Sequence, residues 1–205
     1  TGKCHDSHNV TYFAKIIFVN AACLNSNLIL LNSTSNRFPN GLGNDNGLLG
    51  KYIAFHEYRG NITATLDGYD DKYEYGRKPT AAMLPNFRNV YKQEMDFLRG
   101  YMVRSSASRP NWQQGYGKEG IGVEFKNELI DPGGWSIYMM MQGETIPIEK
   151  NHVRLSKDQK DVWGIPLLIT SIDYSENDNK MVKDFLQVGA EMLEKAGCKN
   201  INPYN

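Results

Sequence analysis

Four histidines are the side chains of this sequence best suited to acid–base or metal chemistry, because imidazole titrates near neutral pH and binds metals. His5 and His8 are three residues apart, a spacing that could serve a metal on a helix. The polar residues around them favour a turn instead, and no third ligand is visible. We therefore expect no metal site.

The other two histidines lie in expected strands. His56 stands between Phe55 and Glu57, in the middle of a strand, where a buried and hydrogen-bonded structural histidine is the more common arrangement. The alternative is that His56 lines a binding site. His152 opens a later strand, and we expect it to be exposed.

Nucleophile and phosphate-binding patterns are missing from the sequence. There is no G-x-S-x-G elbow and no C-x-x-C pair among the three cysteines, Cys4, Cys23 and Cys198. The glycines between residues 41 and 47 lack the strand–helix frame and the lysine of a phosphate loop, which favours turns. The residues alone identify no catalytic site.

The composition is that of an ordinary folded chain. Of 205 residues, 40% are hydrophobic and 22% charged, and 23 basic residues balance 23 acidic ones. A neutral chain has no electrostatic reason to bind nucleic acid or an anionic membrane, and no apolar run reaches membrane-spanning length. The chain opens with Thr1 instead of Met, so we expect a piece of a longer protein. We take a bacterial cytoplasm, over the periplasm, as its default location.

The first elements expected form a strand–turn–helix unit. The unbroken β-branched and aromatic run at residues 16–19 is typical of a strand covered on both faces, as in a parallel sheet. Small residues follow, and then leucines at helical spacing from Leu24 to Leu31. The Asn- and Gly-rich stretch at residues 32–47 predicts a loop, and we place a domain boundary near Gly43.

The rest of the chain predicts strands and two helices. Alternation predicts two antiparallel strands within residues 50–66, broken at Arg59-Gly60, and residues 67–94 look irregular. Further elements are strands within 97–108, 135–142, 151–155 and 167–172, a short helix at 123–129 and a turn at 158–164.

The last helix has the clearest signals. Apolar residues from Met181 to Leu193 share one face, Ser175 is a suitable N-cap and Gly197 a suitable stop. The sum is an α+β chain: a mainly antiparallel sheet with flanking helices, and a short βα remnant at the front.

Four segments resemble the glucose-methanol-choline (GMC) family of FAD-dependent oxidoreductases. AKIIFVNAACLNSNLILLNS resembles the family's last FAD-binding strand and turn, with alanine where a glycine is usual, and GNDNGLLGKYIAFHEY resembles the entry into the substrate domain. GETIPIEKNHVRLS and DVWGIPLLITSIDYSENDNKMVKDF resemble two later signatures. The resemblance runs from about Ala14 to Ala196.

The resemblance implies a domain assignment and a cofactor. Residues 1–42 would be a remnant of the FAD-binding domain, and residues 43–205 a substrate-binding domain that stops before the family's catalytic histidine. The cofactor would be FAD, and the residues that would contact it are Asn20, Ala21, Ala22 and Asn25. No residue of this chain would be catalytic, and the isolated chain would be inactive and would not retain FAD.

The resemblance also implies a substrate. Such enzymes oxidise the CH–OH group of alcohols or sugars by hydride transfer to the flavin, so the partners would be a small alcohol or sugar and the FAD-binding part of the same protein. The expected substrate-side residues are His56, Arg104, Tyr138 and Gln142. The polar and aromatic residues on the expected strands of this face favour a sugar or glycoside: Arg104, Ser106, Trp112, Tyr138 and Gln142. The alternative function is a non-catalytic carbohydrate-binding α+β module.

Overall fold

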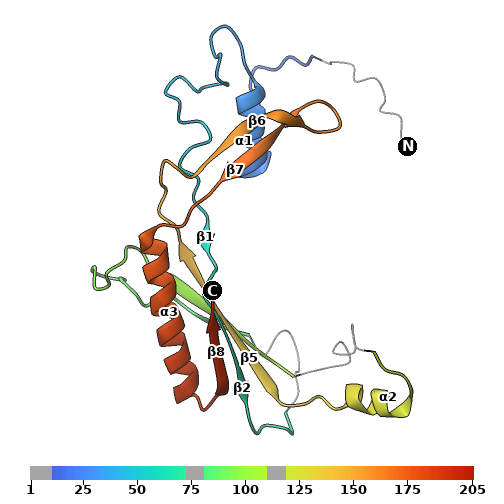
Figure 1. Cartoon of the computed structure of the whole chain (residues 1–205). Helices are drawn as coiled ribbons and strands as arrows, with labels where there is room; N and C mark the ends of the chain where they lie inside the picture. Colours follow the sequence, from blue (N-terminus) through green and yellow to red (C-terminus); the bar gives the residue numbers. More distant parts are fainter. Residues whose placement is uncertain (1–10, 73–80, 110–118) are drawn as a thin grey trace. The chain divides into compact units, whose positions relative to one another are not determined.

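The computed structural model describes residues 11–72, 81–109 and 119–205. His5, His8, Cys4 and Trp112 lie outside these residues. The described chain is α+β with a mainly antiparallel sheet, as the sequence predicted (Figure 1). Its elements are α1 (Ala22–Asn32), β1 (His56–Glu57), β2 (Asn61–Leu66), β3 (Ala81–Leu84), β4 (Tyr101–Ser108), α2 (Gly122–Ile130), β5 (Trp135–Glu144), β6 (His152–Lys160), β7 (Pro166–Ser171), α3 (Glu176–Lys195) and β8 (Lys199–Tyr204).

The chain divides into two compact units, each made of two segments. The first unit joins Thr1–Ala54 with Pro147–Asp173, and the second joins Phe55–Ile146 with Tyr174–Asn205. The expected boundary near Gly43 lies inside the first unit. The assignment of the segments to FAD-binding and substrate-binding domains stays a prediction.

The first unit is built from α1 and the hairpin of β6 and β7. The two strands pair antiparallel from His152 opposite Ser171 to Leu155 opposite Leu168, and α1 packs against both. Asn151 closes the base of the hairpin, since its side chain accepts from the backbone N–H of Asp173 and donates to that residue's carbonyl.

The strand expected at residues 16–19 is not present. This segment has no regular structure, and Ile16, Ile17 and Phe18 are 71%, 75% and 79% exposed. A β-branched run becomes a strand only where a neighbouring strand takes up its backbone hydrogen bonds, and no described strand pairs with it.

The second unit is a six-stranded antiparallel sheet with the order β3-β4-β5-β2-β8, in which β1 also pairs with β5. The two strands expected within residues 50–66 exist, but they do not pair with each other: β1 and β2 both pair with β5. The sequence did not indicate β3 or β8, and β6 continues to Lys160 where a turn was expected from residue 158.

Helix α3 covers one face of this sheet and encloses the core of the unit, as Figure 1 shows. Phe185 and Met181 are fully buried against Ile62 and other apolar residues of the strands. The predicted ends of this helix are confirmed, because Ser175 accepts from the backbone of Asp178 in a capping box and Gly197 has a φ of +83°.

Candidate functional site

The candidate site is the face of the six-stranded sheet opposite α3, named the open face here. In β4 and β5 every second residue points into the core, beginning with Tyr101 and Met139. The residues between them point the other way. They include Met102, Arg104 and Ser106 on β4, and Tyr138, Met140 and Gln142 on β5, which lie opposite one another in register.

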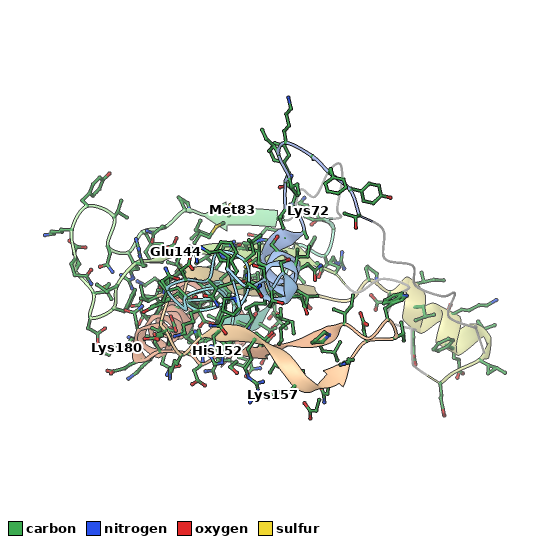
Figure 2. All side chains as sticks on the ribbon, turned by 90° about the horizontal axis from the view of Figure 1, so that it is seen from above. Lys72, Met83, Glu144, His152, Lys157 and Lys180 are labelled. Carbon is green, nitrogen blue, oxygen red and sulfur yellow. The ribbon has the colours of Figure 1, made fainter. Side chains whose placement is uncertain are left out.

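Figure 2 shows the two sides of the sheet in this unit: Met83 of β3 and Glu144 of β5 lie on the side away from Lys180 of α3. All four substrate-side residues expected from the sequence lie on the open face or at its end, although they come from three strands. Their role in binding stays a prediction.

One end of the open face holds a groove of about 670 Å³. Its polar lining includes His56, Asn86, Arg99, Gln142 and Glu144. His56 lies opposite Glu144 in the pairing of β1 with β5, and Arg99 forms an ion pair with the same carboxylate at 3.6 Å. The groove therefore carries both hydrogen-bond donors and acceptors, and the charges of Arg99 and Glu144 offset each other.

His56 does not have the buried structural environment that was the commoner expectation. The side chain is exposed and packs edge-on against Tyr58, with ring centroids 5.5 Å apart. The reason is the alternation of β1, which directs the neighbouring Glu57 into the core and His56 away from it. His56 lines the groove instead.

A second cavity, named the hollow, adjoins the groove through Met83, which lines both. The hollow has a volume of about 440 Å³. Its lining consists of Ala81, Ala82, Met83, Arg104, Ser105, Ser106, Tyr138 and Met140. A largely apolar wall with few polar groups is typical of small-molecule sites.

Tyr138 is held in place within the hollow. Its hydroxyl donates to Oδ1 of Asn61 on the neighbouring strand at 2.5 Å. The amide of Asn61 is itself fixed, because Nδ2 donates to the carbonyl of Arg59 at 2.8 Å and to that of Tyr58 at 3.2 Å. The phenolic oxygen is thus presented in one orientation with a lone pair available to a ligand.

Burial raises the pKa of Tyr138, and the nearby Tyr204 raises it further, while the positive charge of Arg104 lowers it. The net direction is upward, so the phenol is neutral at physiological pH. A neutral phenol can both donate and accept hydrogen bonds, which suits it to hydroxyl groups.

The residue whose carbonyl fixes Asn61, Arg59, forms an ion pair with the buried carboxylate of Glu57. Glu57 is completely buried, and its two oxygens accept from Nε and Nη2 of Arg59 at 2.9 to 3.1 Å. The guanidinium of Arg59 also stacks 3.5 Å over the ring of Tyr174 and donates to Asn179 at the start of α3. The turn between β1 and β2, which supplies the carbonyls that fix Asn61, is therefore anchored to α3.

A second network joins β4 to α3. Asp184 accepts from the hydroxyl of Tyr101 at 2.6 Å and from two nitrogens of Arg88 at 2.9 Å. Burial and the Asp184 carboxylate raise the pKa of Tyr101 well above its ordinary value. Neither Asn61 nor this network was found from the sequence, because both depend on which strands are neighbours.

The residues expected to contact FAD lie together in the first unit, at the N-terminus of α1. Asn20, Ala22 and Asn25 are exposed, and Ala22 has a positive φ of 59°. Ala21 is the N-cap, no side chain caps the helix, and no acidic residue occurs in its first turn.

Within the residues that the structure describes, no group of three or more His, Cys, Asp and Glu side chains is placed to hold a metal ion. In the same part of the chain, no helix combines the length and apolar character that crossing a bilayer requires.

Comparison with known proteins gives one informative match. No protein-family profile matches the chain. Over 189 residues the chain is 29% identical to a 2-methyl-1,2-propanediol dehydrogenase of Mycolicibacterium austroafricanum. The match covers 87% of this chain but only 32% of that protein, so the chain spans about a third of its relative's length. The chain is therefore similar, over most of its own length, to part of a protein named as a dehydrogenase.

Proposed function

We propose that this chain is the substrate-side part of an FAD-dependent oxidoreductase of the GMC type, which oxidises the CH–OH group of an alcohol or sugar. The observation that carries the proposal is the open face, which places a fixed neutral phenol beside a hollow and a polar groove. The similarity to a protein named as a diol dehydrogenase supports the reaction class.

The residues of this chain would bind and orient the alcohol. Tyr138 can accept a hydrogen bond from a substrate hydroxyl while its own O–H continues to donate to Oδ1 of Asn61. His56 and Gln142 can bond further hydroxyl groups in the groove. Holding the substrate in one orientation removes much of the entropic cost of the reaction, and the apolar methionines of the wall help to exclude water.

The residues at the start of α1 fit a nucleotide cofactor in one respect. An uncapped helix N-terminus with small side chains and no acidic residue leaves backbone N–H groups available to an anionic group such as a pyrophosphate. Asn20, Ala21, Ala22 and Asn25 would hold this part of FAD. When bound, the flavin would supply the acceptor for the hydride, and no residue of this chain is assigned as a catalytic base.

Expression of the complete protein that contains this chain tests the proposal. We expect a yellow protein that releases FAD on heating and that reduces an artificial electron acceptor with at least one member of a panel of diols, sugars and glycosides. A colourless protein that binds sugars without oxidising them would favour the carbohydrate-binding module and overturn the proposal.

A further inference from the structure

Arg104 differs from the other arginines of the described residues. The side chain of each of the others has a hydrogen-bond or ion-pair partner: Arg37, Arg59, Arg88 and Arg99 pair with carboxylates, and Arg109 and Arg154 donate to backbone carbonyls. The side chain of Arg104 makes neither a hydrogen bond nor an ion pair with any residue that the structure describes, although the residue lies in the middle of a strand within a sheet.

Arg104 is exposed, and no described acidic side chain pairs with it. Its neighbours in register are Met83 on β3 and Met140 on β5, two apolar side chains. None of the residues that line the hollow is acidic. The positive charge of Arg104 lowers the pKa of Tyr138, whereas burial raises it. A guanidinium in such a cavity can bind a carboxylate through two parallel hydrogen bonds.

The remaining polar groups of the hollow suit the rest of such a ligand. The hydroxyl of Ser106 makes no hydrogen bond within the described residues, and the Tyr138 oxygen keeps a free lone pair. Both lie on the open face with Arg104, since Ser106 pairs with Tyr138 and Arg104 with Met140. A molecule that carries one carboxylate and one or more hydroxyl groups would satisfy all three side chains.

We propose that the hollow is an anion-selective subsite in which Arg104 binds the carboxylate of a hydroxylated acid, such as a sugar acid or a uronic acid glycoside. This inference rests on the proposed function, because it names the class of alcohol that the open face takes. Ser106 and Tyr138 bind hydroxyl groups of the same molecule, and Arg104 determines the specificity.

The test compares two glycosides that differ in one group. Methyl β-D-glucuronide carries a carboxylate where methyl β-D-glucoside carries a hydroxymethyl group. Binding to the complete protein is measured by calorimetry, and oxidation is measured with an artificial electron acceptor. We expect tighter binding of the glucuronide, and a weaker preference as salt is added, because a partly exposed ion pair is screened.

The Arg104→Gln variant should lose about 10- to 100-fold in affinity for the glucuronide, as expected for a charged hydrogen-bonded pair, while binding of the glucoside changes little. Arg104→Lys should retain part of the preference, since it keeps the charge but not the two-pronged geometry. Arg154→Gln, which removes an exposed arginine from the other unit, is the control and should alter neither affinity.

The outcomes separate this inference from the proposed function. Equal affinity for the glucuronide and the glucoside, or an affinity for the glucuronide that Arg104→Gln leaves unchanged, overturns the anion assignment even if the protein oxidises neutral alcohols. Arg104-dependent binding of the glucuronide by a protein that oxidises no alcohol supports the assignment and overturns the proposed function. Failure to bind any carboxylate probe also overturns the assignment.

Discussion

The hydroxyl of Tyr138 and the side-chain oxygen of Asn61 are 2.5 Å apart across the adjacent strands β5 and β2, and the phenol is the donor. Because the Asn61 amide donates to two backbone carbonyls, its oxygen is the atom that faces Tyr138. The hydroxyl that this pair presents to the hollow is therefore positioned by β2 as well as by β5.

Tyr138→Phe removes this hydroxyl and should weaken substrate binding by about 1 kcal/mol, the usual net contribution of a neutral hydrogen bond. Asn61→Leu should have an effect in the same direction, because the phenol is then free to rotate. Folding stability should change little in Tyr138→Phe, since the side chain is 36% exposed. Steady-state kinetics and thermal melting of the complete protein would check both, and the idea fails if the two variants bind substrate like wild type.

Breaking the Glu57–Arg59 pair should destabilise the second unit strongly. Glu57 is fully buried and the Arg59 side chain is 25% exposed, so Glu57→Gln, which removes a charged hydrogen-bonding partner from the guanidinium, should cost about 2 kcal/mol. Urea unfolding measures the change. The control is Glu149→Gln, which removes the exposed ion pair with Lys51 and should leave the midpoint unchanged. Equal effects in the two variants would contradict the anchoring role of Glu57.

Gly50 should tolerate no side chain. Its φ is +84°, and an added Cβ would lie 2.5 Å from the carbonyl oxygen of Val153. Gly43 also has a positive φ, of +74°, but an added Cβ there meets nothing within 4 Å. Both alanine variants carry a backbone cost of about 1 kcal/mol, and only Gly50→Ala adds a clash with the backbone. A lower melting temperature in Gly50→Ala than in Gly43→Ala is expected, and the reverse order would show that the contact is not formed.

Tyr101 should make stability depend on pH in the alkaline range. Its pKa is raised above the ordinary value of 10.0, so the folded state binds the phenolic proton more tightly than the unfolded chain does. The resulting stabilisation is fully present below pH 10 and is lost as pH rises toward the folded pKa. Tyr101→Phe should flatten this dependence, as followed by unfolding at several pH values. Absorbance titration of tyrosinate should show that one late-ionising group disappears in this variant.

The sequence predicted the elements whose signals are local. Helix α3 followed from the apolar face around Phe185, the cap at Ser175 and the stop at Gly197, all of which the structure confirms. Strands β4 and β5 also followed from local pattern, and with them the presence of Arg104, Tyr138 and Gln142 on the sheet.

Features that depend on distant partners were not predicted. Strand β8 contains Pro203 and two asparagines, a composition that does not favour a strand, and it forms because β2 offers an edge to pair with. Conversely, the run Ile16–Val19 has the right residues but no described partner, and it is not a strand. Asn61 could be recognised as part of the site only once β2 was known to lie beside β5.

The division of the chain into interleaved segments has a practical consequence for work on this protein. The polypeptide passes between the two units three times, at Ala54/Phe55, Ile146/Pro147 and Asp173/Tyr174. No single truncation or protease cut can release either unit intact, because each is assembled from two stretches of backbone. Isolating one of them requires breaks at all three crossings and a new linker, and for the second unit that linker would connect Ile146 to Tyr174.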